Sequence, residues 1–438
     1  MASQTFALGS VATVNWWNDV NDAINDDVVN VKSTVYGAVG NDSNDDTEEL
    51  QAAITAAVAG KKPLILPAGT YKITAGLTCN GPIKIIGAGA NQTIIKYYAT
   101  TGTAFTFTNA PGSYDDGFSM QGIKFEQENA KAGSAIGLKF QGIVWNVSSV
   151  QDVQVLNFGG TGIYVDDCLT ASFERVRSAQ NNGAGWTIVK SNGVTLIHCS
   201  AESNRSNGYS LSNDGTAGER YGIALIECHA EENCGHAVYA HESNSLLISG
   251  GWWQVAGLNP SDGTSQANAF SAFELDATTY CIVTGARITT GGNTSLLVGV
   301  NFNGALYSTV SNNTFSSFAS GKDVVGTASS GRNGVFGCSG SGAQKQITYT
   351  DSSSTGNVYS NHLGSGSDYG MEWFAKYHSF QTVAGSEKLR VDTNGVNFVN
   401  HTTGTSAPSA GGAGALPATP AGYITVKIGG TNRQIPYY

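Results

Sequence analysis

Two glutamates, Glu202 and Glu231, hold the same position in two segments that align without gaps, VTLIHCSAESNRSNGY from Val194 and IALIECHAEENCGHAV from Ile223. Stacked parallel strands lie about 4.8 Å apart, so aligned side chains on neighbouring strands come close together. Retaining glycosidases place two carboxyl groups about 5 Å apart, and inverting ones about 6.5–9.5 Å apart. Repulsion between close carboxylates raises one pKa, which yields one acid and one ionised partner. The two glutamates are therefore the first catalytic candidates.

Further ionisable side chains are expected around this pair. In the same alignment Arg177 and His229 fall in an outward column, and Glu227 stacks near His198 and Arg175. Arg177, His229, Glu227 and Arg175 are therefore candidate substrate-binding residues. The alternative interpretation is a solvated strand face whose charges keep the protein in solution, since outward glutamates are common.

Two more carboxylate pairs could carry chemistry. Asp166 and Asp167 lie in the segment YVDDC, which resembles an Asp-Asp-Cys element of polygalacturonases in which one carboxylate acts as an acid. The companion elements of that family, Asn-Thr-Asp, Gly-His-Gly and Arg-Ile-Lys, are missing from this chain. Glu274 and Asp276, in the segment FELDA, are two residues apart and would share one face of a strand. They form a third candidate pair.

Aromatic residues near these strands could stack on sugar rings. Trp252 and Trp253 are candidate substrate-binding residues, and the alignment places Trp253 in the column of the two glutamates. Trp186 and Tyr209 follow a glycine-containing bend and are expected in the core.

No metal or cofactor is expected. Cys228, His229, Cys234 and His236 have a spacing that loosely resembles a metal site, but alternation points Cys228 inward and His229 outward. The sequence His229-Ala230-Glu231 lacks the Pro-Cys-x-x-Cys that a zinc deaminase needs. Gly87-Ala88-Gly89 lacks the third glycine of a dinucleotide site.

The elements that must position these residues are indicated by internal repetition. Four segments begin at Ala171, Val194, Ile223 and Ser245, and the first two steps between them are 23 and 29 residues. Apolar or small residues alternate with polar residues within these segments, which is typical of strands with one buried face. The apolar columns are Phe173, Leu196, Leu225 and Leu247, then Val176, Cys199 and Cys228. Asn181, Asn204 and Asn233 share a column at a bend, where asparagine tolerates left-handed dihedrals. These columns favour a parallel β-helix over a β-sandwich.

The segment from Val35 to Ile73 predicts a helix and then strands. Asp45, Asp46 and Thr47 provide N-cap chemistry, apolar residues follow at helical spacing, and Gly60 ends the helix. The motifs Tyr36-Gly37-Ala38, Asp45-Asp46-Thr47 and Leu66-Pro67-Ala68-Gly69-Thr70-Tyr71 closely resemble the opening of the pectate-lyase-like superfamily found in bacteriophage tailspikes. The resemblance implies an all-β, right-handed parallel β-helix with a short N-terminal capping helix.

Three regions are expected along the chain. Residues 1–33 form a lead-in or attachment segment, 34–365 the parallel β-helix, and 366–438 a C-terminal β-rich region. The segment KLRVDTNGVNFVN from Lys388 predicts a hairpin, and GYITVKIGGTNRQIPYY predicts two short strands. This ending resembles the tip of phage tail fibres and tailspikes, where three chains intertwine. The resemblance at both ends implies a homotrimer.

Composition excludes several classes of protein. The formal net charge of −10 argues against nucleic acid as a partner. No apolar run reaches the roughly 18 residues of a membrane span, and the N-terminus lacks a signal-peptide pattern. Seven scattered cysteines suggest reduced thiols and synthesis in a cytosol.

The resemblance implies a phage tailspike that binds and depolymerises a bacterial surface polysaccharide, capsule or O-antigen. Hydrolysis by paired carboxylates is the preferred chemistry. A polysaccharide lyase acting by β-elimination is the first alternative, and a non-catalytic glycan-binding spike is the second. Such a protein is made in the host cytoplasm, joins the phage tail through a baseplate or adaptor protein, and acts outside the host cell.

Overall fold

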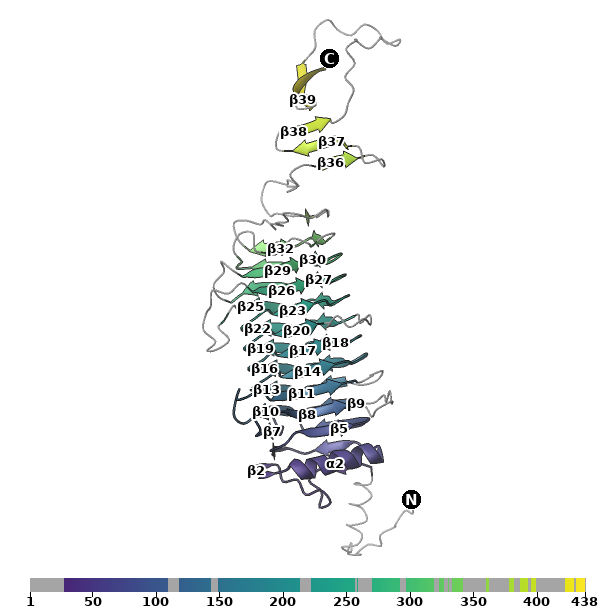
Figure 1. Cartoon of the computed structure of the whole chain (residues 1–438), viewed down its shortest axis with the longest axis vertical. Helices are drawn as coiled ribbons and strands as arrows, with labels where there is room; N and C mark the ends of the chain where they lie inside the picture. Colours follow the sequence, from purple (N-terminus) through teal and green to yellow (C-terminus); the bar gives the residue numbers. More distant parts are fainter. Residues whose placement is uncertain are drawn as a thin grey trace, which may run out of the picture. The chain divides into compact units, whose positions relative to one another are not determined.

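The computed structural model describes residues 27–108, 118–142, 149–212, 222–256, 258, 270–291, 297–318, 323–326, 330 and 333–341, together with the strands that follow them. The chain divides into two compact units, residues 1–369 and 370–438. The first unit is a stack of coils, each of which adds one strand to each of three parallel sheets (Figure 1). This is the right-handed parallel β-helix that the sequence predicts. Most of the predicted lead-in, residues 1–33, lies outside the described residues.

Three sheets form the sides of the stack, and within each sheet the strands lie side by side in the following order. Sheet A contains β1 (Val29–Asn30), β3 (Leu64–Leu66), β6 (Ile83–Gly87), β9 (Phe118–Gln121), β12 (Ser149–Gln151), β15 (Ser172–Glu174), β18 (Thr195–Ile197), β21 (Ala224–Ile226), β24 (Leu247–Ser249), β27 (Ile282–Thr284), β30 (Thr309–Ser311), β33 (Gly334–Phe336) and β35 (Ser360–Asn361). Sheet B contains β2 (Asn41–Asp45), β4 (Gly69–Ile73), β7 (Thr93–Tyr97), β10 (Lys124–Gln127), β13 (Gln154–Leu156), β16 (Arg177–Ala179), β19 (Ser200–Glu202), β22 (His229–Glu231), β25 (Trp252–Val255), β28 (Arg287–Thr290), β31 (Thr314–Ser316) and β34 (Ser339–Ser341). Sheet C contains β5 (Leu77–Asn80), β8 (Thr103–Thr108), β11 (Ile136–Gln141), β14 (Ile163–Asp166), β17 (Trp186–Val189), β20 (Tyr209–Ser212), β23 (Val238–His241), β26 (Ser271–Asp276), β29 (Val298–Asn303) and β32 (Val324–Gly326).

The helix α2 (Thr47–Gly60) covers the first coils and packs against β1, β3 and β5. It begins and ends where the sequence predicts. Asp46 does not cap it through its side chain, because the carboxylate instead accepts hydrogen bonds from the backbone N–H groups of Val39 and Gly40, at 2.6 and 3.0 Å. The helix therefore closes the N-terminal end of the β-helix core.

A ladder of asparagine side chains runs along the bend between sheets B and C, as predicted. The Nδ2 group of Asn181 donates to Oδ1 of Asn204, and Nδ2 of Asn204 donates to Oδ1 of Asn233, both at 2.9 Å. All three residues are buried. Because a buried polar group without a partner is costly, each amide satisfies its neighbour and fixes the spacing of successive coils.

Aromatic rings form a second ladder inside the β-helix, with successive centroids 5.0–6.2 Å apart: Phe107, Phe140, Phe173, Trp186, Tyr209, Trp253 and Phe273. Trp186 and Tyr209 are in the core, as expected. Aromatic pairs of this kind each contribute about 0.5–1.5 kcal/mol beyond the burial of their surface.

The predicted role of Trp253 as an exposed sugar platform is wrong, because Trp253 is fully buried. The gapless alignment places Leu247 beside Leu225, whereas the structure pairs Leu225 with Ile248. It likewise pairs Ala230 with Trp253. A shift of one residue turns every side chain to the other face of the sheet. Apolar residues occupy neighbouring positions in this segment, so the sequence pattern is satisfied in either register.

The second unit is a five-stranded sheet with the order β36 (His378–Gln381), β37 (Glu387–Asp392), β38 (Gly395–Phe398), β39 (Gly422–Ile428) and β40 (Thr431–Tyr437). The antiparallel pairs β37–β38 and β39–β40 are the two hairpins expected from the sequence. No helix in the described part of the chain is long and apolar enough to cross a membrane.

Candidate functional site

Glu202 and Glu231 are neighbours on the outer face of sheet B, in the register expected from the sequence. Each, however, has a basic partner. Arg177 donates to Oε2 of Glu202 from Nε at 2.9 Å and from Nη2 at 2.7 Å. His229 Nε2 lies 3.1 Å from Oε2 of Glu231. These contacts bring together four of the residues that the sequence singled out.

The arginine contact changes the acidity of Glu202. Burial alone would raise the pKa of this carboxyl group, but hydrogen bonds from Arg177 and Ser200 and the nearby positive charge together lower it. Glu202 therefore stays ionised and is a poor proton donor. The raised pKa that the sequence predicts for one of the two glutamates is therefore not found at Glu202.

The other predicted substrate-binding residues lie on sheet B and at its corner with sheet A. Trp252 is partly exposed, and its ring meets the ring of His229 edge-on, with centroids 5.0 Å apart. Arg175 and Glu227 lie at the corner between sheets A and B, each with a left-handed backbone. Arg175 binds Asp152 through two hydrogen bonds, and Glu227 accepts one from the N–H of Gly251.

Asp166 and Asp167 lie apart from the glutamates, on and beside sheet C. Asp166 ends β14 on the outer face, and Asp167 begins the following corner with a φ of 57°. The outward column of Asp166 continues through Val189 and Ser212 before it reaches His241. Three strand spacings separate Asp166 from His241, so Asp166 does not join the cluster described next.

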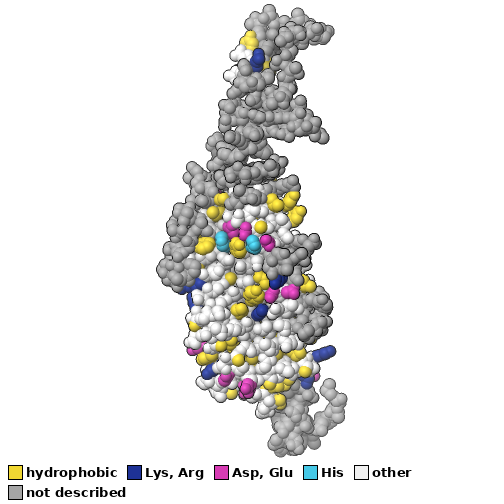
Figure 2. All heavy atoms as spheres, viewed as in Figure 1, with side chains coloured by type: hydrophobic (Ala, Val, Ile, Leu, Met, Phe, Trp, Pro, Cys, Tyr) yellow, Lys and Arg dark blue, Asp and Glu magenta, His cyan; other side chains and the backbone are white. Residues whose placement is uncertain are grey.

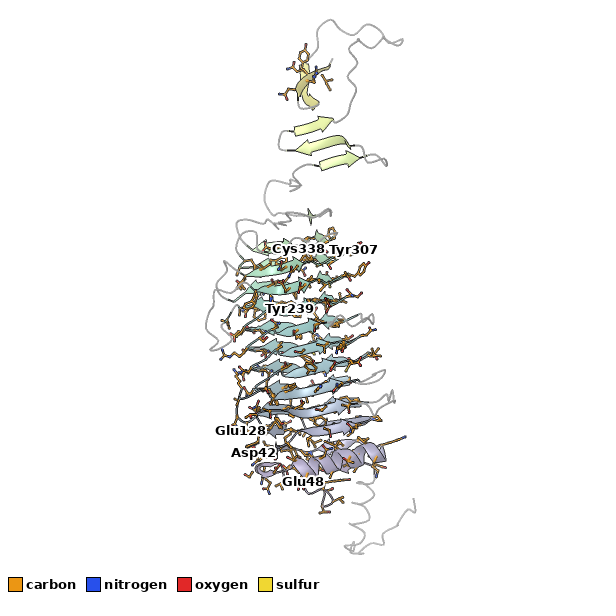
Figure 3. The ribbon with its side chains drawn as sticks, viewed as in Figure 1. Asp42, Glu48, Glu128, Tyr239, Tyr307 and Cys338 are labelled. Atoms are coloured by element: carbon orange, nitrogen blue, oxygen red, sulfur yellow. The ribbon has the colours of Figure 1, made fainter. Side chains whose placement is uncertain are left out.

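A denser cluster occupies the outer face of sheet C, on β23, β26 and β29. The strand register aligns Tyr239 with Glu274, and His241 with Asp276. Figure 2 shows acidic and histidine side chains gathered on a surface of mostly uncharged polar atoms, on the face where Figure 3 labels Tyr239. We call the residues His236, Tyr239, His241, Glu274, Asp276, Asn301 and Asn303 the sheet C cluster.

Asp276 is the hub of the sheet C cluster. Its Oδ2 accepts hydrogen bonds from the hydroxyl of Tyr239 at 3.1 Å and from Nδ1 of His241 at 2.7 Å. Its Oδ1 accepts a hydrogen bond from Nδ2 of Asn303 at 3.0 Å. Three donors from two neighbouring coils therefore hold one carboxylate that remains partly open to solvent.

Glu274 lies on the same strand in a different environment. Only 8% of its surface is exposed, and its oxygens accept hydrogen bonds from Ser271 Oγ at 2.7 Å and from Asn301 Nδ2 at 2.9 and 3.0 Å. Burial raises its pKa despite these hydrogen bonds, and the charge of Asp276 adds to the rise. Two carboxyl groups on one strand thus differ in burial and in their hydrogen-bond partners.

His236 and Tyr239 complete this arrangement. Burial lowers the pKa of His236 to about 4, and its Nδ1 lies 3.0 Å from the backbone N–H of Ser271 and 4.0 Å from Glu274. Burial also raises the pKa of Tyr239, and the neighbouring Asp276 raises it further. The imidazole is therefore neutral and the phenol is protonated near pH 7.

Sequence reasoning found part of this cluster. Glu274 and Asp276 were a candidate pair because their alternate spacing places them on one face. Tyr239 and His241 carried no such signal, because the aligned segments ended at Val238 and omitted most of sheet C. His236 lies within the segment from Ile223, but its spacing from Cys228 and Cys234 only loosely resembles a metal site. The step from Tyr239 to Glu274 is 35 residues, which breaks the shorter repeat. Only the pairing of β23 with β26 brings these side chains together.

No group of three histidine, cysteine, aspartate or glutamate side chains within the described ranges has the geometry to hold a metal ion. Among these residues, the only basic side chains within 4.0 Å of Glu274 and Asp276 are His236, at 4.0 Å from Glu274, and His241, at 2.7 Å from Asp276. The sheet C cluster therefore contains side chains that can donate protons and side chains that can accept them.

Comparison with known proteins agrees with the fold. The family model described as "Rhamnogalacturonase A/epimerase, pectate lyase-like" matches residues 28–259, just over half of the chain. Mannuronan C5-epimerase AlgE3 of Azotobacter vinelandii is 43% identical over 75 residues, which are 15% of this chain and 4% of that protein. The chain thus aligns with only a small part of this curated relative.

Two solved structures resemble the β-helix. The A-module of mannuronan C-5 epimerase AlgE4 from Azotobacter vinelandii has a TM-score of 0.59 at 18% identity, covering 76% of this chain and all of that module. The Dettilon tailspike protein (gp208) has a TM-score of 0.56 at 13% identity, covering 80% of this chain and 71% of that protein. At these identities the likeness establishes the fold alone.

Proposed function

The chain belongs to the pectate-lyase-like rhamnogalacturonase A/epimerase family, and from this premise we propose that it binds and depolymerises a bacterial surface polysaccharide at the sheet C cluster. The observation that carries the proposal is the contrast between two carboxyl groups on β26. Glu274 is buried with a raised pKa, whereas Asp276 is partly exposed and accepts three hydrogen bonds. Pairs of titratable groups in opposed environments are typical of acid and base roles.

Glycoside hydrolysis is the reaction that this contrast supports best. Glu274 in its neutral form protonates the glycosidic oxygen as the bond to the anomeric carbon breaks. Asp276 as a carboxylate either activates a water molecule or attacks the anomeric carbon itself. The hydrogen bonds from Tyr239, His241 and Asn303 hold the carboxyl group of Asp276 in one orientation.

β-Elimination on a uronic acid polymer is the second candidate, and the Tyr239–Asp276–His241 contact favours it. The lyase reaction removes the proton at C5 and breaks the bond at C4 of the sugar. The imidazole of His241 can accept a proton, and the protonated phenol of Tyr239 can donate one to the leaving oxygen. Neutral Glu274 and Asn301 can then bind the substrate carboxyl group without a fixed positive charge. The likeness to an enzyme named mannuronan C5-epimerase points to the same class of substrate.

The biological setting proposed is the tail of a bacteriophage. The resemblance to a tailspike structure and the opening motif support it. In this setting the chain acts as a homotrimer on the host surface and is joined to the tail through a baseplate or adaptor protein. A spike that binds glycan without cleaving it is the non-catalytic alternative.

The decisive experiment separates the two carboxylate pairs. The protein is incubated with mannuronan, alginate, rhamnogalacturonan and purified capsular and O-antigen polysaccharides, and polymer size is followed by size-exclusion chromatography. We expect Glu274→Gln and Asp276→Asn to abolish shortening of the substrate, and the double variant Glu202→Gln/Glu231→Gln to retain it. The reverse result would move the active site to sheet B.

Product analysis distinguishes the two reactions. Mass spectrometry of hydrolysis products shows one added water for each bond cleaved, whereas elimination leaves an unsaturated sugar that absorbs ultraviolet light. If no polysaccharide is shortened while binding persists, the non-catalytic spike is the correct function.

A further inference from the structure

Two tyrosines on successive coils form an exposed aromatic surface at the corner between sheets C and A. Tyr280 is 58% exposed and Tyr307 is 41% exposed, although both have large apolar rings. Their rings are stacked, with centroids 5.2 Å apart and planes inclined by 16°. Figure 3 labels Tyr307 beside the last coils of the stack. We call these two residues the corner tyrosine pair.

The corner tyrosine pair occupies backbone positions that do not favour tyrosine. Both residues have a left-handed backbone, with φ of 56° for Tyr280 and 54° for Tyr307. Equivalent corners of earlier coils contain Thr170 and Ser245, which also have a left-handed backbone, and Gly193 and Gly222, which adopt it without strain. A bulky side chain at positive φ is an uncommon and costly choice. Left-handed corners are common in this chain, so the pair is set apart by its two exposed rings that stack on each other.

The pair lies on the same coils as the sheet C cluster. Tyr280 follows Asp276 by four residues, and Tyr307 follows Asn303 by four residues. Four residues span at most about 14 Å of extended chain, so the Cα atoms of Tyr280 and Tyr307 lie within that distance of those of Asp276 and Asn303. An extended polysaccharide that crosses sheet C at Asp276 therefore reaches the pair within a few sugar units.

We propose that the corner tyrosine pair is a binding subsite for sugar rings of the same polysaccharide chain, remote from the bond that is cleaved. Stacked aromatic rings present a flat apolar surface, which suits the C–H face of a pyranose, while the phenol hydroxyls remain in water. This subsite rests on the proposed function of the sheet C cluster. It adds affinity for long chains and leaves the chemical step unchanged.

The test replaces both tyrosines with serine, the residue at the equivalent position 245, and compares this variant with a phenylalanine pair that keeps the rings. Binding is measured by native electrophoresis in gels that contain mannuronan, alginate, rhamnogalacturonan or dextran. All binding variants also carry Asp276→Asn, so that the gel polymer is not degraded. We expect Tyr280→Ser/Tyr307→Ser to weaken binding about tenfold and Tyr280→Phe/Tyr307→Phe to preserve it.

Turnover is measured in proteins with Asp276 intact. The serine pair is expected to raise KM for the long polymer by a similar factor, to leave kcat unchanged, and to unfold at the same temperature or a higher one. Cleavage with unchanged affinity and KM would overturn the subsite and leave the proposed function standing. Binding that depends on the rings, with no polymer ever shortened, would leave the subsite standing and overturn the cleavage.

Two further results would count against the subsite. The first is that none of the four polymers retards the protein. The second is that sedimentation velocity shows the serine pair breaking an oligomer that the phenylalanine pair preserves. In that case the corner tyrosine pair is a contact between copies of the chain.

Discussion

Asp276 lies on the coil that follows His241, and its Oδ2 is 2.7 Å from the imidazole Nδ1. The two residues share an outward column of sheet C in which Asp166 lies three coils before His241 and four before Asp276. The same column thus contains a carboxylate held by Tyr239 and His241 and another outside the cluster. This arrangement provides a matched pair for mutagenesis.

Asp276→Asn is expected to reduce turnover by about 10²–10⁴-fold, since the change removes a general base or nucleophile. Asparagine is nearly isosteric, so the melting temperature should change little. Asp166→Asn is the control and should retain full activity. Turnover by reducing-end assay and melting by circular dichroism measure both effects, and equal activity of the two variants would contradict the placement of the site.

Glu274→Gln is expected to abolish turnover and to increase stability near neutral pH. Because burial raises the pKa of Glu274, the fold favours its protonated form. The stability it contributes is fully present below the unfolded pKa and is lost as pH rises through the higher folded value. Glutamine stays neutral throughout, so the stability advantage of the variant should increase with pH. Thermal unfolding at about pH 4 and about pH 8 measures this difference, and an advantage that shrinks with rising pH would argue against a buried acid.

The raised pKa of Glu274 also predicts how kcat decreases on the alkaline side of the pH–rate profile. A general acid must be protonated, so kcat should fall as pH rises through the raised pKa of Glu274. A pH–rate profile of the unmodified protein tests this prediction. A rate that rises steadily across the same range would favour the elimination reaction, in which a base must be deprotonated.

His236→Asn should reduce the loss of stability in acid. Burial lowers the pKa of His236 to about 4 in the folded chain, well below its unfolded value of about 6.5. The unfolded chain therefore binds more protons in this window, and stability falls as pH drops from about 6.5 to about 4, by up to about 3 kcal/mol. Asparagine preserves an acceptor for the N–H of Ser271. Urea unfolding at both pH values measures the difference, and parallel curves for the two proteins would contradict a neutral His236.

Trp253→Ala is expected to destabilise the protein by about 3–5 kcal/mol, because it leaves a cavity in the ring ladder beside Tyr209 and Phe273. Trp252→Ala is the adjacent control. Its side chain is 36% exposed, so the variant should lose at most about 1 kcal/mol. Chemical denaturation of both variants tests the register of β25, and similar losses would place the ring of Trp253 outside the core.

The sequence alone was sufficient to predict the parallel β-helix. The alternation of apolar and polar residues that marks a strand with one buried face is a local pattern. Alternation of apolar and polar residues, together with the Asn181–Asn204–Asn233 column, predicted which side chains share a column from β15 and β16 to β21 and β22, but placed β24 and β25 one residue out of register. It also placed Glu202 beside Glu231. The helix at Thr47–Gly60 follows from capping and spacing within one short segment.

Only the tertiary structure determined the pKa of Glu202 and which residues make up the sheet C cluster. Arg177 ion-pairs with Glu202 across 25 residues, and this contact lowers a pKa that burial alone would have raised. Tyr239 and Glu274 become neighbours across a step of 35 residues, which no short repeat reveals. Trp253 is buried because packing selected one of two registers that the apolar pattern allowed equally. Alternation is a property of neighbouring residues, whereas burial, pairing and proton affinity depend on which coil lies against which.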